Sequence, residues 1–329
     1  DDEVVLKSIT NTYYIAHDLI ENFTPDTEVR LPGFVVPPDS TANETLRKFC
    51  FEGLKSMGLF TRKDYVERLE TEIDVIEDRG FSKYFLTMKA VADKSNAVML
   101  TGPGRGSAAG SLVAYVLGIT QVDPIKYNLL FERFLRKDAT DYPDIDYDVA
   151  DPMEIKQALM DEWGKSTVVP ISNFNTLQLR SLIKDISKFY NVPFTDVNPL
   201  HGQTRAVSRH AGGVVIGEDL DKHMPLIQSG GVLQTPWSEG QNVRHLEPLG
   251  FIKFDILGLS TLRMIEGAIS LILKKHHGIK NPTFEDVKNY YKDNLHPDQI
   301  DLNDQEVYNN IFHKGKFAGI FQFTETGAQ

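Results

Sequence analysis

The segment Tyr142-Pro143-Asp144-Ile145-Asp146-Tyr147-Asp148-Val149 alternates carboxylates with apolar residues. Alternation with a period of two is typical of a β-strand that has one polar and one apolar face. Asp144, Asp146 and Asp148 would then share one face of the strand. Because three like charges in a row repel each other, this face calls for a cation or for solvent.

Two interpretations of these carboxylates are open. Hard divalent cations prefer carboxylate oxygens, so the face suits a Mg²⁺ site for phosphate chemistry. The alternative is a solvated edge strand or an acidic turn. A calcium-binding EF-hand loop is excluded, because the positions where it needs Gly and Glu hold Val149 and Ile155.

A further carboxylate, Asp255, stands within the apolar segment 250–257, which also has the character of a strand. Lys253 and Asp255 would share one face of it, so a structural ion pair between them is one interpretation. The other is that this strand lies beside segment 144–148 and completes a metal site. Two-metal phosphoryl or nucleotidyl transfer needs carboxylates that hold two Mg²⁺ ions about 3.5–4 Å apart.

A glycine-rich loop, 102–106, is expected between a short strand (97–100) and a small-residue helix (107–117). Its glycines let backbone N–H groups approach an anion, and the start of the helix adds positive potential. Arg105 and Ser107 can donate further hydrogen bonds to phosphate oxygens. A purely structural tight turn is the alternative.

Two familiar nucleotide-binding motifs compete for this loop. It lacks Gly-Lys-Ser/Thr, so it is not a Walker A loop. Gly104, Gly106 and Ala109 fit a loose dinucleotide-binding fingerprint. The acidic residue at the required spacing, Asp123, precedes a proline in an expected loop, which weakens that interpretation.

Apolar spacing and capping residues predict the other elements. Helices are expected around 13–21 and over 42–58, 64–77, 84–92, 173–190 and 304–312, with one starting at Pro152 after an Asp151 cap and one over 260–277 capped by Ser260. Residues 210–216 are expected to form a strand.

Composition limits the class of protein. The 329 residues are 41% hydrophobic and 25% charged, which is enough for roughly two domains with a sizeable core. The single cysteine, Cys50, excludes a disulfide framework and is expected in the core. No long apolar run and no signal peptide is present, so we expect a cytoplasmic protein with no membrane partner.

The formal net charge of −11 argues against non-specific coating of nucleic acid. Residues 173–215 are nevertheless locally basic, with five Arg or Lys against two Asp. A nucleic-acid track and a solvated helix face explain this equally well.

Six motifs, in order along the chain, resemble the C-family bacterial replicative DNA polymerases, the DNA polymerase III α subunits. They are GPGRGSAAGSLVAYVLGIT (102–120), LLFERFL (129–135), PDIDYD (143–148), SRHAGGVVI (208–216), GFIKFDILGLSTL (250–262) and GIFQFTE (319–325). The resemblance runs from about residue 30 to the end. It implies an α+β fold: a polymerase-β-like nucleotidyltransferase palm, with a mixed sheet flanked by helices and small helical additions.

The resemblance also implies roles for individual residues. Asp144, Asp146 and Asp255 correspond to the catalytic, metal-binding aspartates, and Asp148 to a weaker supporting carboxylate. The loop residues Gly104, Arg105, Gly106 and Ser107 would hold the incoming triphosphate. Arg209 would contact the nucleotide's triphosphate or the DNA backbone, and His210 would have a structural role or contact a phosphate of the nucleotide. Further expected contacts to DNA are Arg180, Lys184 and Lys253.

The implied activity is DNA-directed DNA polymerisation. Two Mg²⁺ ions, which Mn²⁺ can replace, would assist attack of a primer 3′-hydroxyl on a dNTP. Expected partners are primer–template DNA, the dNTP and further polymerase domains or subunits, such as PHP, fingers and sliding clamp. A non-catalytic palm fragment in a larger replication assembly and a template-independent nucleotidyltransferase are the alternatives, and the host is a bacterial cell or a phage-infected one.

By the same resemblance the chain divides into five parts. Residues 1–40 resemble the exit of a PHP domain, 41–172 and 208–260 form the two parts of the palm, 173–207 a reduced thumb, and 261–329 the start of the fingers.

Overall fold

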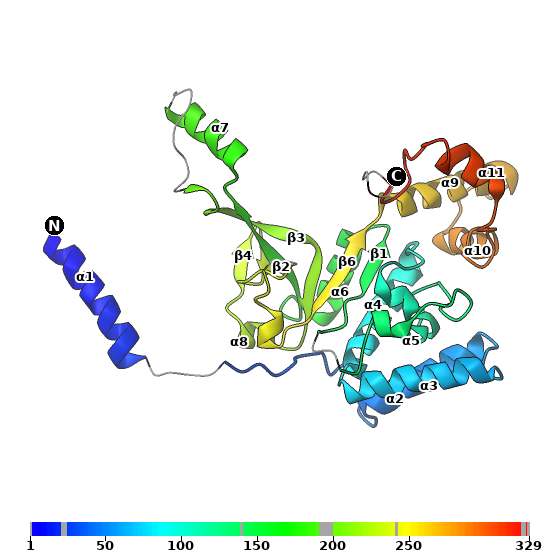
Figure 1. Ribbon diagram of the computed structural model, residues 1–329, viewed down its shortest axis with the longest axis horizontal. Helices are drawn as coiled ribbons and strands as arrows, with labels where there is room; N and C mark the ends of the chain where they lie inside the picture. Colours follow the sequence, from blue (N-terminus) through cyan, green and yellow to red (C-terminus); the bar gives the residue numbers. More distant parts are fainter. Residues whose placement is uncertain are drawn as a thin grey trace.

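A computed structural model of the protein describes residues 2–20, 25–138, 141–190, 200–240, 243–323 and 327. Its centre is a four-stranded sheet in the order β1-β6-β3-β2 (Figure 1). The strands are β1 (Asp146–Val149), β2 (Val168–Thr176), β3 (Thr204–Ile216) and β6 (Lys253–Gly258). β1 runs parallel to β6, whereas β6 with β3 and β3 with β2 are antiparallel.

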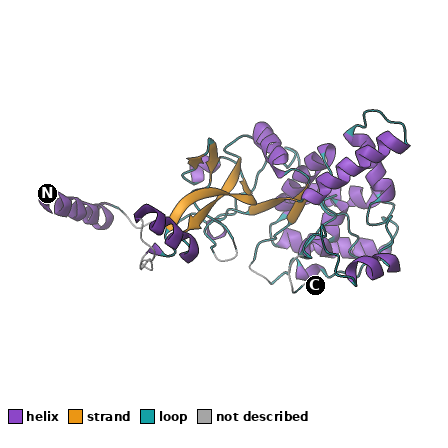
Figure 2. Cartoon of the chain, turned by 90° about the horizontal axis from the view of Figure 1, so that it is seen from above, coloured by secondary structure: helices purple, strands orange, loops and turns teal. Residues whose placement is uncertain are grey.

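Helices gather at one end of this sheet (Figure 2). The longer ones there are α2 (Ala42–Ser56), α3 (Lys63–Asp78), α4 (Ser82–Val98), α6 (Pro152–Trp163), α9 (Ser260–His276) and α10 (Phe284–Asn294). The shorter ones are η2 (Ser107–Gly110), α5 (Leu112–Val116), η3 (Phe131–Arg133), α11 (Gln305–Val307) and η6 (Tyr308–Phe312). This mixed sheet with its flanking helices confirms the expected α+β palm of polymerase-β-like type.

Alternate residues of the neighbouring strands β1 and β6 contribute to the main core. Tyr147 and Val149 of β1 and Phe254 and Ile256 of β6 are buried with helices α4 and α6 against them. Tyr84 of α4 stacks on Phe254, with ring centroids 4.9 Å apart. Burying this face fixes the register of both strands, because a slip by one residue would turn their apolar side chains to the other face. Cys50 lies in the same core, as expected.

A second, smaller core lies beneath β2 and β3. It is built around Val169, Ile171, Val215 and Phe251, with α8 (Leu220–His223) packed on it. The hairpin of β4 (Ile227–Ser229) and β5 (Val232–Gln234) and the turn η5 (Glu247–Leu249) complete this region. Neither β4 nor β5 was expected from the sequence.

The N-terminal helix α1 (Asp2–Tyr14), with η1 (Ile15–Leu19), lies apart from the rest of the molecule (Figure 1). No residue of either element is buried. The helix expected around 13–21 therefore begins earlier, and residues 21–24 lie outside the described residues. An extended segment then joins the palm, where the Arg30 N–H donates to the Gly250 carbonyl at 3.0 Å.

Three local expectations were wrong. No strand forms at 97–100, because the buried stripe of α4 continues through Val91, Ala92 and Ser95 and carries the helix to Val98. The helix expected over 107–117 is divided at Ser111, whose side chain accepts the Ala114 N–H and caps α5. Leu259, not Ser260, is the N-cap of α9.

The expected helix over 173–190 was also wrong in its first turn. Residues 173–176 belong to β2 and pair with 204–208 of β3, so pairing between distant segments overrides the local pattern. Helix α7 (Leu179–Tyr190) follows and lies at the far end of the long β2–β3 arm (Figure 1). The expected boundaries at 172 and 208 thus fall within continuous strands, and residues 191–199 of the expected thumb lie outside the described residues.

No helix among the described residues combines the length and the apolar character that crossing a lipid bilayer requires.

Candidate active site

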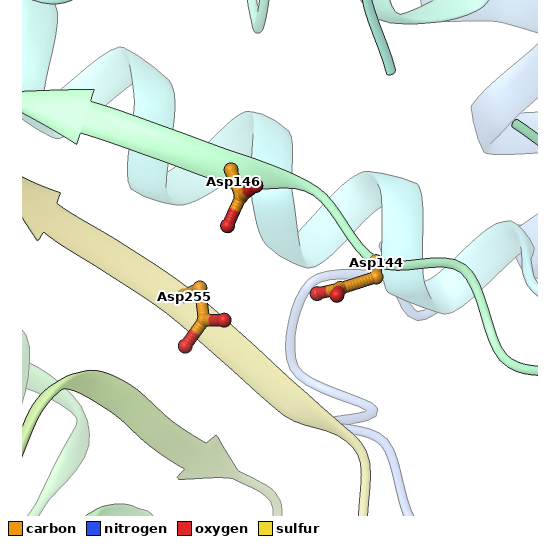
Figure 3. Close-up of side chains that lie close together, drawn as sticks. All are labelled: Asp144, Asp146 and Asp255. Carbon is orange, nitrogen blue, oxygen red and sulfur yellow. The ribbon is translucent and has the colours of Figure 1, made fainter. Parts of the chain in front are cut away.

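Two neighbouring parallel strands bring three aspartates together. Asp146 of β1 is the register partner of Asp255 of β6, and Asp144 lies in the turn just before β1. Carboxylate oxygens of all three lie within 4.8 Å of one another. Figure 3 shows the side chains directed into a common space between the two strands. The sequence expectation that segment 250–257 lies beside segment 144–148 is therefore correct.

The buried residues next to these aspartates in the sequence fix the position of the carboxylates. Ile145 is buried between Asp144 and Asp146, and its N–H donates to the Tyr84 hydroxyl at 3.1 Å. Tyr84 also stacks on Phe254 of β6. This one buried ring therefore contacts both the segment before β1 and the strand β6 on their apolar face. The carboxylates are left on the opposite face, where Asp144 is exposed, Asp146 is partly exposed and Asp255 is buried.

Asp255 is the most constrained of the three carboxylates. It is 6% exposed, and its Oδ2 lies 2.7 Å from the Lys253 ammonium. The ion pair with Lys253 and the approach to Asp144 and Asp146 therefore coexist in the structure. Its Oδ1 is buried without a hydrogen-bond partner among the described residues. A buried, unpaired carboxylate oxygen costs free energy, and a cation between the strands would compensate it.

The electrostatics of the cluster also favour a bound cation. Burial raises the pKa of Asp144, and the charges of Asp255 and Asp146 raise it further. Burial by itself lowers the pKa of Lys253. The hydrogen bond to Asp255 and the charges of the nearby aspartates raise this pKa by more, so the net shift is upward. Three carboxylates lie here beside one ammonium group. Oxygen ligands at this spacing suit a hard divalent ion.

Asp148 does not join the cluster. Its Oδ2 lies 3.5 Å from Nε of Arg105, and it is 8% exposed. Burial raises the pKa of Asp148, which the guanidinium partly offsets. Asp148 is therefore placed to form an ion pair with Arg105, and not to bind a cation together with the other three aspartates.

The glycine loop lies along the outer edge of β1. The Gly102 N–H donates to the Asp148 carbonyl at 2.8 Å. A side chain at Gly102 would place its Cβ 2.8 Å from the Cβ of Asp148, so only glycine allows this approach. Gly106 has a φ of +64° and faces Asp146. The helix after the loop is a single 3₁₀ turn, so the expected contribution of a helix N-terminus is much smaller than the sequence suggested.

Arg105 connects this loop with the aspartates. One NH2 nitrogen lies 3.7 Å from Asp146, and the guanidinium lies over the ring of Phe321 at 5.6 Å. Its Nε is buried without a hydrogen bond among the described residues. Ser107 is exposed beside it. A cation and an open loop next to a metal-type cluster can receive an anion such as a phosphate.

His210 lies on an irregular part of β3, where the pairing with β2 shifts between Pro170 and Ser172. Its Nδ1 accepts the Gly213 N–H at 2.6 Å and the Gly212 N–H at 3.3 Å. Burial lowers the pKa of His210, which keeps the ring neutral at pH 7. His210 therefore shapes the strand opposite Asp255, while Arg209 is exposed on the same strand.

Lys156 of α6 is a buried site residue that was not expected from the sequence. This lysine is 4% exposed, and its ammonium donates to the Ala211 carbonyl at 2.8 Å. Burial lowers the pKa of Lys156 to about 8. Its position one turn before the buried Met160, on an otherwise apolar stripe, is a signal that could have indicated a buried lysine.

A pocket next to Asp144 was also missed. Glu239, Arg244 and Glu247 line it together with Lys253. Glu239 is buried and accepts the Leu246 N–H at 2.7 Å, so it holds the loop that carries Arg244.

The expected DNA contacts are spread over the molecule. Arg180 and Lys184 are exposed on α7, at the far end of the arm and away from the aspartates (Figure 1). Lys253 is paired with Asp255 inside the site. Asp123, which the dinucleotide fingerprint requires, is buried and accepts the Tyr65 hydroxyl at 2.5 Å, so it has a structural role.

Comparison with known proteins agrees with this geometry. Residues 44–201 match the family model described as the bacterial DNA polymerase III alpha NTPase domain. DNA polymerase III subunit alpha of Bacillus subtilis is 33% identical over 350 residues, which cover 91% of this chain and 29% of the relative.

The chain belongs to the DNA polymerase III α family. The subunit of Aquifex aeolicus is 29% identical, covering 98% of this chain and 32% of the relative. That of Campylobacter jejuni is 33% identical, covering 88% and 27%. The chain thus spans less than a third of the length of these relatives. The matched family model includes the glycine loop and β1 but ends before Asp255.

Proposed function

We propose that this chain is the catalytic palm of a DNA-directed DNA polymerase. The observation that carries the proposal is the meeting of Asp144, Asp146 and Asp255 across β1 and β6, beside an arginine-bearing glycine loop. In this reaction the primer 3′-oxygen forms a bond to the α-phosphorus of a dNTP. The bond from that phosphorus to the bridging oxygen breaks, and pyrophosphate leaves.

Asp144, Asp146 and Asp255 would hold two divalent cations, Mg²⁺ or in its place Mn²⁺. The donor set fits these ions, because it offers carboxylate oxygens within 4.8 Å of one another. In addition, Asp255 Oδ1 has no hydrogen-bond partner in the part of the chain that the structure describes. When bound, such ions lower the pKa of the attacking hydroxyl and stabilise the negative charge on the leaving oxygens.

The chain's own residues would bind and orient the substrate. Arg105, Gly106 and Ser107 would contact the triphosphate, with Gly104 giving the loop its shape and Asp148 holding the guanidinium. Lys253 would hold Asp255 in place, since it forms an ion pair with this carboxylate at 2.7 Å.

The remaining assignments concern the surroundings of the site. His210 would keep β3 in its irregular path next to Asp255, and Arg209 would contact phosphate. Residues 173–207, with Arg180 and Lys184 on α7, would form a reduced thumb that touches duplex DNA through its phosphates. Residues 1–40 and 261–329 would connect to PHP and fingers regions.

Primer extension with the whole chain tests this proposal. A labelled primer is incubated with Mg²⁺ and dNTPs, either annealed to a template or alone, using wild type, Asp146→Asn and the exposed control Asp219→Asn. We expect template-dependent extension by wild type and the control, and a loss of at least about 100-fold in Asp146→Asn. Extension of the unannealed primer would favour a template-independent nucleotidyltransferase. If wild type extends neither the annealed nor the unannealed primer, the result would favour a non-catalytic palm within a larger assembly.

A further inference from the structure

A cavity of about 330 Å³ lies behind the glycine loop, between the palm and α10. Its walls come from the end of α4, the segment around Thr101, the turn after α5 and one face of α10. None of the three clustered aspartates lines it. The volume is in the range of sites that enclose a small organic molecule, about 300–1,000 Å³.

The inner wall of this cavity is largely apolar. Met57, Met99 and Leu100 line it, together with the rings of Tyr115 and Tyr291. Methionines adapt their shape to a neighbour and make favourable contacts with aromatic rings. Two tyrosine rings and two methionines together suit a flat aromatic body better than a polar one.

One buried polar group in the wall has no partner. Thr120 is 4% exposed, and its Oγ1 makes no hydrogen bond to any described residue. Two polar groups nearby are engaged: the Tyr291 hydroxyl donates to Gln121 Oε1 at 3.1 Å, and the Gln121 amide donates to the Thr101 carbonyl at 3.2 Å. An unpaired buried hydroxyl costs free energy, and a ligand with a polar atom in the cavity would compensate it.

The charge at this cavity has one sign. Lys288 and Lys292 line it from one face of α10, since residues four apart in a helix are neighbours. The described lining residues include no aspartate or glutamate, although the whole chain has a formal net charge of −11. An acidic group on a ligand would therefore meet two ammonium groups and no carboxylate.

We propose that this cavity is a second ligand-binding site, which takes a small aromatic anion. Its ring lies between Tyr115, Tyr291 and the methionines, its acidic group lies at Lys288 and Lys292, and a polar atom pairs with Thr120. This site is separate from the nucleotide site of the proposed function. A ligand in it also touches residues that hold the glycine loop, because the Gln121 N–H donates to the Pro103 carbonyl at 2.7 Å.

Fluorescence titration of the whole chain with 8-anilinonaphthalene-1-sulfonate, a small aromatic anion, tests the proposal. The titration contains no metal and no nucleotide, so its result is independent of the proposed polymerase activity. We expect saturable binding at one site. Replacing both lysines (Lys288→Gln with Lys292→Gln) weakens it by roughly tenfold or more, and Thr120→Val weakens it by roughly threefold. The matched control, Lys274→Gln with Lys275→Gln on neighbouring α9, leaves the affinity within about twofold.

Amide hydrogen exchange in the presence of the dye locates the site without any substitution. Protection is expected in peptides that cover 96–121 and 284–296. Helix α1 exposes many apolar residues and is the competing surface for this dye. Absence of saturable binding, unchanged affinity in both cavity variants, or protection confined to residues 2–20 would each overturn the proposal.

Discussion

Asp146 and Asp255 face each other as register partners on parallel strands, although they lie far apart in the sequence. Both strands are fixed from below by buried residues, including Tyr84 and Phe254. The separation of the two carboxylates is therefore set by backbone pairing rather than by flexible side chains. A one-residue slip of β6 would turn Asp255 away and place an apolar side chain in the site.

Arg105→Ala should weaken nucleotide binding without removing the metal site. The guanidinium lies between the glycine loop and β1, 3.7 Å from Asp146 and 3.5 Å from Asp148, where it can reach a triphosphate. Loss of charge-assisted hydrogen bonds should raise the Kd for dATP by about 10- to 100-fold. Calorimetric titration measures this. Binding of dAMP is the control and should change much less. Equal losses for dATP and dAMP would contradict a contact with the outer phosphates.

Lys156→Met should change how stability depends on pH. Burial lowers the pKa of Lys156 to about 8 from its usual 10.5, assisted by Arg209 and opposed by Asp255. Between these two values the unfolded chain binds a proton that the folded chain has lost, so this group makes the folded state more stable as pH rises. Relative to the variant, wild type should gain about 1–2 kcal/mol in unfolding free energy from about pH 8 to pH 9.5.

Urea denaturation of both proteins at the two pH values checks this difference. Other titrating groups are common to wild type and variant, so they cancel. A difference that stays constant with pH, or falls, would show that Lys156 is not held in a buried, charge-excluding environment.

Glu72→Ala should destabilise the support of the glycine loop. The side chain is fully buried and accepts hydrogen bonds from Arg68 at 2.7 Å and from the Leu112 and Val113 N–H groups at 3.0 Å. Removal of the carboxylate leaves these donors unpaired at the start of α5, which should cost about 3–5 kcal/mol in unfolding free energy. Glu70→Gln, an exposed change on the same helix, should stay within about 0.5 kcal/mol. Denaturant unfolding compares them, and similar losses in both would refute the role of Glu72.

The sequence was most informative where local pattern and chemistry coincide. Asp144 and Asp146 alternate with apolar residues, and Asp255 interrupts an apolar strand, so each position could be selected before its neighbours were known. One of the two interpretations of Asp255 placed its strand beside segment 144–148, which brings these carboxylates together, but the parallel direction of β1 and β6 was not predicted. Helices α2 and α3 were predicted from their apolar spacing, and α6 from its Asp151 cap followed by Pro152.

Elements that depend on distant partners could not be predicted in this way. Residues 173–176 join β2 only because β3 pairs with them. Lys156 is buried because α6 packs close to β3, where the lysine ammonium donates to the Ala211 carbonyl. The helix is divided at Ser111 because this side chain caps α5. The Ser111 hydroxyl also donates to Glu72, which lies on another helix, so the division depends on a distant residue.

The most direct test of the aspartate cluster is titration of Mn²⁺ into the whole chain, followed by electron paramagnetic resonance, with and without dATP. Asp255→Asn is compared with wild type and with Asp219→Asn, an exposed control outside the site. Wild type and the control should bind Mn²⁺ more tightly when dATP is present, and Asp255→Asn should weaken this binding at least about tenfold. Mn²⁺ binding by Asp255→Asn that matches wild type, with and without dATP, would contradict the metal site between β1 and β6.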